Sequence, residues 1–371
     1  MGKSDRSAAR SNGIGSSAAP RFAINGRFYG QPVTGVQRYA REIVREIDQE
    51  LDNRGEHAEL LIPAGADAAP TSAAIEVRSV NGASGHLWEQ TLLPLRATAP
   101  LLSLCNMGPL ALRRQIVCIH DTNVFDAPDS YSRAFRTAYH LLIPALARRA
   151  MAITTVSNAS ARMLKHHLGV ASLDVAVIPN GHEHVYRWEG ANSRLASSLA
   201  GLRPFVLLLG SRARHKNAAF ILQQAEALDS LGLDLVVAGG SAEIFAQIGS
   251  IEAANIHRLG FVSDDDLAWL YSRALCLAFP SRQEGFGIPL VEAMALGCPV
   301  VSSDQSCMPE ICGDAALLAG PDDGPAWQVH FRNLIASSVL REDLKGRGLA
   351  RVKLFSWRAS AQSYLNLLDQ L

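Results

Sequence analysis

The segment Leu275–Ser303 restricts the fold more than any other part of the chain. It opens with an apolar run, Leu275–Phe279, passes through a glycine-bearing turn at Gly285, and takes up a helical pattern near Pro289. A short β-branched stretch, Val300-Val301, then leads into Ser302-Ser303. A buried strand, a tight turn, a helix and a second buried strand make up one unit of a parallel sheet, so the segment predicts the α/β class.

Two carboxylates flank this turn, with Glu284 before it and Glu292 about one helical turn inside the helix. Gly285 and Gly287 allow a ligand to approach the main chain, and Pro289 suits the first helical turn. The unpaired amides of a helix start attract phosphate, while carboxylates accept hydrogen bonds from vicinal hydroxyls. The turn therefore predicts a site for a phosphorylated sugar. The spacing alone is equally compatible with one capping and one solvated glutamate.

The whole passage resembles the donor-binding signature of the retaining nucleotide-sugar glycosyltransferases of family 4, which have the GT-B fold and two glutamates separated by seven residues. Phe205–Asn217, Leu259–Tyr271 and Met308–Ala316 are similar to further stretches of that family, in the same order. The resemblance thus covers most of residues 200 to 320. It implies two Rossmann-like domains that face a central cleft, and a C-terminal helix that crosses back to the first domain.

The length of 371 residues exceeds one ordinary core, and 48% hydrophobic residues suffice for two. We expect residues 1–20 to be a mobile polar leader and residues 21–185 to be an N-terminal, acceptor-side domain. Residues 200–354 would form the C-terminal domain that binds the nucleotide sugar. Residues 355–371 would be the crossover helix, packed on the N-terminal domain.

A basic loop follows the predicted strand Phe205–Leu209 and precedes a helix that starts near Asn217. Arginine offers a planar fork to a diphosphate and lysine a point charge, although a solvated basic loop has the same composition. The resemblance assigns the leaving diphosphate to Lys216 and one arginine. The arginine spacing departs from the commonest family pattern, so Arg212 is the first choice and Arg214 the reserve.

Other donor-site roles come from the same resemblance. Glu284 and the backbone amides of the turn would hold the sugar, Glu292 the ribose, and the backbone after residue 260 the base. A plain turn glycine remains an equal alternative for Gly35, in the loop that follows the first predicted strand. The implied donor-binding residues, besides Glu284 and the cations, are Gly35, Val262, Gly285, Phe286, Gly287, Ile288 and Glu292.

His120 stands directly after the predicted strand Gln115–Ile119, at the edge where parallel sheets bind ligands. A lone histidine there is more often a buried imidazole that bonds to the main chain. The pair His120–Asp121, however, resembles the family's own pair in the acceptor-side domain. We therefore expect His120 to act near the reacting carbon or the acceptor.

Charge and cysteine usage exclude several classes of protein. Lys+Arg and Asp+Glu number 35 each, which argues against a general nucleic-acid binder. The six cysteines are scattered and read as reduced thiols, with a Cys307–Cys312 disulfide as a minor alternative. Asp264–Asp266 resembles a helix cap more than a metal site. We expect neither a metal nor a cofactor, because the cations and helix amides can stabilise the diphosphate.

The predicted activity is transfer of a hexosyl unit from a nucleoside diphosphate sugar to a hydroxyl, with retention at the anomeric carbon. Family usage favours GDP-mannose, while UDP, ADP and dTDP donors stay open. The acceptor would be an oligosaccharide or a lipid-linked glycan of bacterial surface polysaccharide. Alternatives are a soluble small-molecule acceptor, an epimerase or phosphorylase of the same fold, and an inactive partner of another transferase.

The stretch Tyr131–Ala150 combines four arginines with an apolar centre. It could dock on an anionic membrane, or it could be a helix packed on the sheet with its arginines in water. No apolar run approaches the length of a spanning helix, and residues 1–20 lack the apolar centre of a secretion signal. We therefore expect a cytoplasmic protein, peripheral on the inner face of the plasma membrane if the docking interpretation holds.

Overall fold

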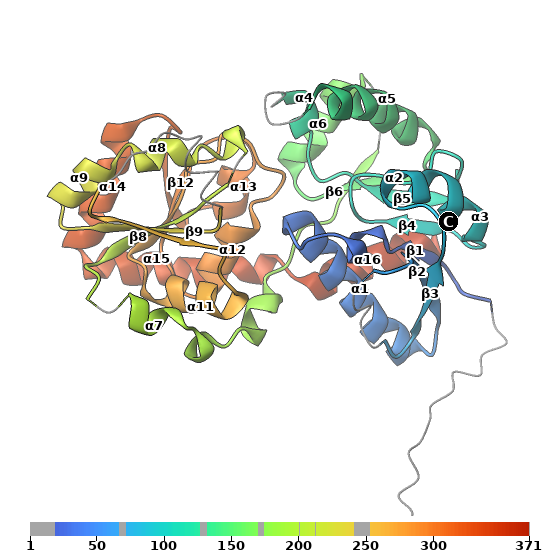
Figure 1. Ribbon diagram of the computed structural model, residues 1–371, viewed down its shortest axis with the longest axis horizontal. Coiled ribbons are helices and arrows are strands. Elements are labelled where there is room, and N and C mark those ends of the chain that lie inside the picture. Colours follow the sequence, from blue (N-terminus) through green and yellow to red (C-terminus); the bar gives the residue numbers. More distant parts are fainter. Residues whose placement is uncertain are drawn as a thin grey trace, which may run out of the picture.

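The computed structural model describes residues 19–66, 72–126, 132–169, 174–199, 201–211, 213–240 and 253–370. These residues form two lobes side by side, each with a parallel sheet between layers of helices (Figure 1). Among them, the sheet orders are β3-β2-β1-β4-β5-β6-β7 and β10-β9-β8-β11-β12-β13. The predicted α/β class is confirmed. The predicted leader lies outside the described residues except for its last two positions.

The N-terminal lobe is built from elements that follow the apolar runs of the sequence. Its strands are β1 (Ala23–Asn25), β2 (Ala58–Pro63), β3 (Ile75–Val80), β4 (Leu101–Ser103), β5 (Gln115–Cys118), β6 (Ala152–Thr155) and β7 (Val175–Val177). Its helices include α1 (Gly35–Arg54), α2 (Gly85–Leu87), the π-helical turn η2 (Trp88–Leu92), α3 (Leu93–Arg96), α4 (Asn123–Asp126), α5 (Arg133–Arg149) and α6 (Asn158–Leu168). The helical stretch from Gly85 to Arg96 is therefore composite, with a π-helical turn between two short α-helices.

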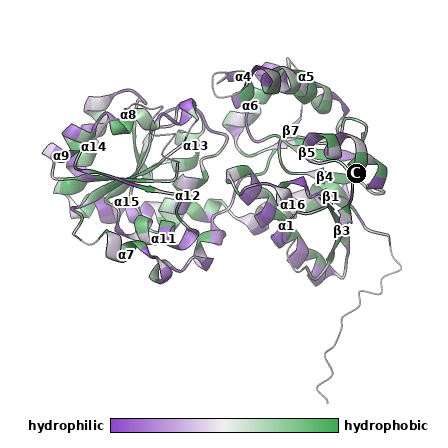
Figure 2. Cartoon of the chain, viewed as in Figure 1, coloured by the Kyte–Doolittle hydropathy of each residue, from purple (hydrophilic) through white to green (hydrophobic). Residues whose placement is uncertain are grey.

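The C-terminal lobe repeats the pattern. Its strands are β8 (Phe205–Leu209), β9 (Asp234–Ala238), β10 (Ile256–Gly260), β11 (Cys276–Phe279), β12 (Val300–Ser303) and β13 (Ala316–Ala319). Its helices include η6 (Arg214–Lys216), α8 (Ala218–Leu222), α9 (Ala225–Ser230), α11 (Asp264–Arg273), α12 (Ile288–Ala295), α13 (Met308–Cys312), α14 (Gly324–Ala336) and α15 (Ser338–Arg351). The buried strands are mostly apolar, whereas most of the longer helices carry hydrophilic residues on one side (Figure 2).

Each sheet has one position at which the strand order reverses. In the N-terminal sheet β1 pairs with both β2 and β4, and in the C-terminal sheet β8 pairs with both β9 and β11. Open parallel sheets bind ligands in the crevice at the carboxyl ends of such strands. The topology thus singles out one crevice in each lobe.

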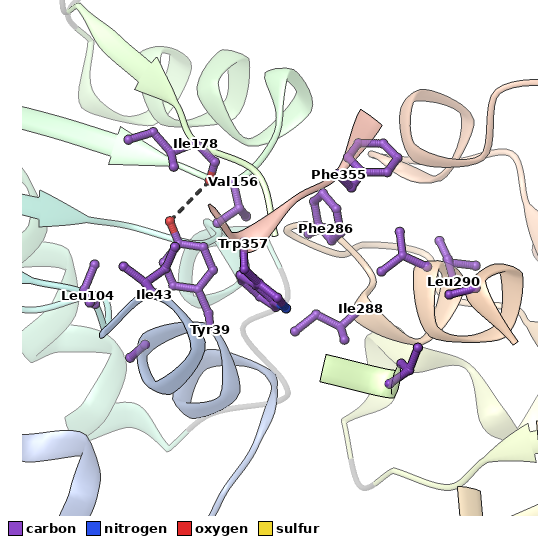
Figure 3. Packing of buried hydrophobic residues seen from close by; sticks show 14 of the residues in the cluster. Tyr39, Ile43, Leu104, Val156, Ile178, Phe286, Ile288, Leu290, Phe355 and Trp357 are labelled. Atoms are coloured by element: carbon purple, nitrogen blue, oxygen red, sulfur yellow. Dashed lines mark hydrogen bonds between the residues drawn. The ribbon is translucent and has the colours of Figure 1, made fainter. Parts of the chain in front are cut away.

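The chain crosses between the lobes twice. The first crossing passes through η4 (Glu183–Arg187), and the second leads into α16 (Trp357–Asp369), which packs on α1. Tyr39 and Tyr364 share a hydrogen bond of 2.8 Å between their hydroxyls, and Trp357 meets Tyr39 edge-on at 5.7 Å between ring centroids. Figure 3 shows this cluster continuing to Phe286 and Ile288 of the other lobe. One apolar core therefore spans both crossings.

Two further sequence expectations concern the surface and the thiols. The basic stretch is the helix α5, and Arg133, Arg148 and Arg149 are exposed on it. No helix within the described ranges is both long and apolar enough to traverse a lipid bilayer. All six cysteines are free, so the Cys307–Cys312 alternative is wrong.

Candidate functional site

The turn after β11 is held by contacts to the side chain and the main chain of Glu284. Ser281 Oγ lies 2.9 Å from Glu284 Oε1, and Lys216 Nζ lies 3.1 Å from the same oxygen. Ser306 Oγ donates to the Glu284 carbonyl at 3.0 Å. The strands β8 and β11 thus bring Lys216 and Glu284 together at the crevice of the C-terminal sheet. These two residues are 68 positions apart in the sequence.

The helix α12 starts where the sequence predicted. Gly287 is its N-cap with φ 84°, in the left-handed region, and a Cβ there would lie 2.9 Å from Leu290 Cδ1. Pro289 occupies the first turn, where a missing N–H costs nothing. The first amides of a helix have no intrahelical acceptor, so this end presents partial positive charge beside Glu284.

The cationic loop forms the short helix η6 between β8 and α8. Lys216 is half-buried, Arg214 is exposed, and Arg212 lies outside the described residues. Between the two cations, His215 is buried; burial lowers its pKa and so does the charge of Lys216, although Glu284 acts in the opposite direction. His215 is therefore neutral at physiological pH, and the cationic charge of the described loop rests on Lys216 and Arg214.

Glu292 is only 4% exposed, and protein groups occupy both of its carboxylate oxygens. His184 Nε2 lies 3.0 Å from Oε1, and the Tyr271 hydroxyl donates to Oε2 at 3.3 Å. Trp357 Nε1 lies 3.0 Å from His184 Nδ1. Because an indole N–H can only donate, His184 Nδ1 accepts the hydrogen bond from Trp357. The proton of this imidazole is therefore on Nε2, which donates a hydrogen bond to Glu292. The first crossing is thus hydrogen-bonded to this glutamate directly and the second only through His184, a relation that the sequence did not reveal.

The other residues predicted to bind the donor, among them Gly35, Phe286 and Val262, belong to different elements. Gly35 begins α1 of the other lobe, and a Cβ built on it would lie 3.6 Å from Ile288 Cδ1. Phe286 is buried and packs edge-on against Phe355. Val262 follows β10 and is half-buried, next to Phe261, which is 93% exposed. Gly35 therefore lies against the start of α12, whereas Val262 follows the edge strand of the C-terminal sheet.

His120 does not present its imidazole to Glu284. Its ring is 5% exposed, with Nε2 2.8 Å from the Leu104 carbonyl oxygen and its plane edge-on to Tyr39. Its carbonyl oxygen, in contrast, lies against Gly285, where an added Cβ would be 2.4 Å away. The neighbouring Asp121 is half-buried, and its desolvation raises its pKa. The group that contacts the turn at Gly285 from the end of β5 is therefore the main-chain carbonyl of His120 and not its imidazole.

The two lobes contact each other across the cleft. Ser157 Oγ and Ser160 Oγ donate to the Gly285 carbonyl at 2.6 and 3.1 Å. The Glu310 carboxylate, on α13, accepts the amides of Asn158 and Ala159 at 2.8 and 2.9 Å. A carboxylate from one lobe therefore caps the helix α6 of the other, and the molecule is in a closed state.

A pocket of about 270 Å³ remains open at the rim of this closed cleft. It adjoins the turn that carries Glu284. Its lining comes from both lobes: Ala159, Arg162, Met163, Arg282, Gln283 and Ser306.

The Asp264–Asp266 cluster has structural partners. Asp266 forms a capping box with Ser263 at the start of α11, and Asp264 pairs with both terminal nitrogens of Arg38 from α1, at 3.1 and 2.6 Å. The predicted cap is present, and one aspartate also joins the lobes. In the part of the chain that the structure describes, no three His, Cys, Asp or Glu side chains are grouped as metal ligands would be.

Comparison with known proteins agrees with this geometry. Residues 33–184 match the sequence profile of Glycosyltransferase Family 4, and residues 193–350 match that of Glycosyl transferases group 1. The chain belongs to glycosyltransferase family 4. The two profiles meet near the first crossing between the lobes, so each corresponds to one sheet.

Individual relatives of this family-4 chain match over shorter stretches. It is 42% identical over 111 residues to O-antigen chain mannosyltransferase B of Escherichia coli, covering 30% of this chain and 29% of that protein. It is 29% identical over 230 residues to an O-antigen chain mannosyltransferase of Salmonella typhimurium, covering 60% of this chain and 61% of that protein. The chain thus spans less than two thirds of either relative.

Among solved structures, sucrose-phosphate synthase from Thermosynechococcus elongatus superposes with a TM-score of 0.73 at 19% identity, over 94% of this chain and 98% of that one. At such identity the likeness concerns the fold. The predicted GT-B architecture, two Rossmann-like lobes facing a cleft, is confirmed.

Proposed function

We propose that this protein transfers a hexosyl unit from a nucleoside diphosphate sugar to a hydroxyl of a glycan acceptor in bacterial surface polysaccharide assembly. The observation that carries the proposal is the 3.1 Å contact of Lys216 with Glu284 at the crevice of the C-terminal sheet. A cation, a carboxylate and a helix start meet there. This combination suits a diphosphate joined to a polyhydroxylated sugar.

Each part of the donor then has a partner. Lys216, with Arg212 or Arg214, stabilises the charge that develops on the departing diphosphate. Glu284 and the amides of the α12 start hold the sugar hydroxyls. Glu292 holds the ribose, for which it must exchange one of its present partners, His184 or Tyr271. The contacts between lobes exclude water from the cleft and limit hydrolysis of the donor.

The finer assignments follow from the relatives. Two relatives are named O-antigen chain mannosyltransferases, so GDP-mannose is the first donor to test and a lipid-linked glycan the first acceptor. We infer retention of anomeric configuration from the family and assign the positive charge at the diphosphate to side chains and amides rather than to a metal. The exposed arginines of α5 provide a membrane-facing surface for a protein on the cytoplasmic side.

A nucleotide panel tests the donor site. GDP, UDP, ADP and dTDP are compared by thermal shift, since a ligand at 100 times its dissociation constant stabilises by about 2.7 kcal/mol. We expect one nucleotide to raise the melting temperature, and Lys216→Ala to abolish most of that rise. Lys353→Ala, an exposed lysine in the C-terminal segment, is the control. An unchanged nucleotide shift in Lys216→Ala contradicts the site.

Turnover separates the proposal from its rivals. With donor and acceptor, a transferase releases nucleoside diphosphate and forms a glycoside whose α anomer, seen by NMR, shows retention. An epimerase alters the donor sugar without an acceptor, a phosphorylase requires phosphate, and an inactive partner shows no turnover. Activity that is unchanged by EDTA supports the metal-independent assignment.

A further inference from the structure

A second polar cluster lies in the N-terminal lobe, away from the donor turn. Asn25 is the last residue of β1 and Ser103 the last of β4, and Asn25 Nδ2 donates to Ser103 Oγ at 3.3 Å and to Glu89 Oε1 at 2.7 Å. β1 and β4 are the strands between which the order of this sheet reverses. The cluster therefore occupies the ligand crevice of its own sheet, as Lys216 and Glu284 occupy that of the other.

Glu89 is a buried carboxylate whose oxygens both have partners. Its side chain is 1% exposed; Oε1 accepts from Arg27 Nε at 3.1 Å as well as from Asn25, and Oε2 lies 3.0 Å from His86 Nδ1. Burial opposes ionisation, but the hydrogen bond with His86 and the charge of Arg27 outweigh it and lower the pKa of Glu89. An ionised Glu89 accepts the proton of His86 Nδ1 and so fixes the tautomer of that imidazole.

His86 is the member of the cluster that faces outward. Its side chain is 43% exposed, and with the proton on Nδ1 its Nε2 carries a lone pair. The neighbour of Nε2 is the Tyr139 hydroxyl of α5 at 3.4 Å, a distance at which a hydrogen bond is weak. Because Glu89 fixes the orientation of the imidazole, the exposed Nε2 of His86 is suited to accept a hydrogen bond from a ligand hydroxyl.

The backbone that carries the cluster is rigidly placed. Glu89 lies on the π-helical turn η2, and such turns occur frequently at functional sites. On either side of it, Trp88 Nε1 donates to the Val80 carbonyl at 3.1 Å, and the Gln90 amide bonds the main chain of Gly108 and Leu110, at 2.9 Å each. These bonds fix the position of His86 relative to the sheet.

The cluster is within electrostatic reach of the closed cleft. Burial raises the pKa of Tyr139 to about 12, and the charges that act on it include those of Arg27, Glu89 and Asp121. Asp121 directly follows His120, whose carbonyl touches the donor turn at Gly285. The carboxylate of Glu284 in turn acts on Asp121. Ser103 ends β4, which pairs with β5, and His120 follows the end of β5, so the cluster lies at the same edge of the N-terminal sheet as the carbonyl that touches Gly285.

We propose that His86 binds a hydroxyl of the acceptor through Nε2, and that Glu89 is its positioning residue. The inference rests on the proposed transferase function and adds the acceptor's contact residue. The ligand class is a neutral, hydroxyl-bearing glycoside, because Arg27 and Glu89 neutralise each other and leave no net charge for a phosphate at His86. Phosphate groups of a longer acceptor would lie elsewhere.

Binding of octyl α-D-mannopyranoside tests this proposal. Its affinity is measured by saturation-transfer NMR in the presence of the nucleoside diphosphate that gives the largest thermal shift. We expect His86→Ala to weaken glycoside binding at least tenfold and to leave the nucleotide shift unchanged. His166→Ala, an exposed histidine on α6, is the matched control and should bind as the wild type does.

A second variant distinguishes ligand contact from a structural role. His86→Asn keeps a donor at the position of Nδ1 for Glu89 but has no atom at the position of Nε2. Glycoside binding that stays weak in this variant supports the proposal, and binding restored to the wild-type level overturns it. Failure of the wild-type protein to bind the glycoside also overturns it. Absence of any nucleotide shift refutes the proposed function instead, since the glycoside can be titrated without nucleotide.

Discussion

Gly285→Ala tests whether the closed state seen here is the state that reacts. A Cβ at this position would lie 2.4 Å from the His120 carbonyl oxygen, 3.1 Å from its carbonyl carbon and 3.3 Å from Asp121 Cβ. Ordinary van der Waals contact begins near 3.4 Å, so the methyl group requires about 1 Å of extra separation. The obstructing atom is main chain, and therefore the lobes, rather than a side chain, must yield.

The expected effect is large for turnover and small for nucleotide binding. A misplacement of about 1 Å in an active site costs roughly 100-fold in rate. The cationic loop and α12 belong to the C-terminal lobe, so the nucleotide thermal shift should stay near that of the wild type. Release of nucleoside diphosphate in the presence of acceptor should fall about 100-fold.

Gly346→Ala is the matched control for this substitution. Gly346 lies in α15 with no atom within 4 Å of its added Cβ, and alanine stabilises a helix interior by up to about 1 kcal/mol relative to glycine. Its turnover should equal that of the wild type. Wild-type turnover in Gly285→Ala would refute the reasoning, because the lobes would then not approach this closely during the reaction.

Three further predictions concern the contacts between and beneath the lobes. Glu310→Ala should accelerate amide hydrogen exchange at Ala159 about tenfold or more, because a charge-assisted hydrogen bond contributes about 1.5–3 kcal/mol; unchanged exchange would show that the cap is absent in solution. Trp357→Phe removes the N–H that bonds His184 Nδ1 and so fixes the tautomer of the imidazole that contacts Glu292. Calorimetry should show a nucleotide affinity reduced several-fold. An affinity equal to that of the wild type contradicts the proposal that Glu292 holds the ribose. Glu89→Gln should lower the free energy of unfolding by about 3 kcal/mol at pH 7. Because the pKa of Glu89 is lowered on folding, this contribution is present above its ordinary value of 4.5 and disappears as pH falls through the native value, so denaturant unfolding of variant and wild type should converge in acid.

Local patterns in the sequence were sufficient for the elements and for the donor turn. The run Leu275–Phe279 and the helix expected near Pro289 are observed as Cys276–Phe279 and Ile288–Ala295. Both follow from apolar periodicity and from the residues that begin a helix. The resemblance to the family placed Lys216 and Glu284 at one crevice, at the carboxyl ends of parallel strands, but their direct contact was not predicted.

Contacts that join distant elements could not be predicted in this way. Asn25 and Glu89 are 64 residues apart, and Asn158 and Glu310 are 152 apart. A glutamate in an apolar helical stretch gives no signal of its partner, and the π-helical turn that carries Glu89 has no pattern distinct from an α-helix. The hydrogen bond of the His120 imidazole to the Leu104 carbonyl is likewise a contact that the sequence does not show.

The two covalent crossings between the lobes limit how they can move. A single connection would let one lobe rotate freely relative to the other. The chain crosses twice, at residues 178–188 and at residues 355–357. The lobes can therefore rotate most easily about the line that joins these two crossings. Both pass beside Glu292, through His184 and Trp357. Opening of the molecule must therefore resemble the movement of a door, with Glu292 and the turn at Phe286 beside the hinge.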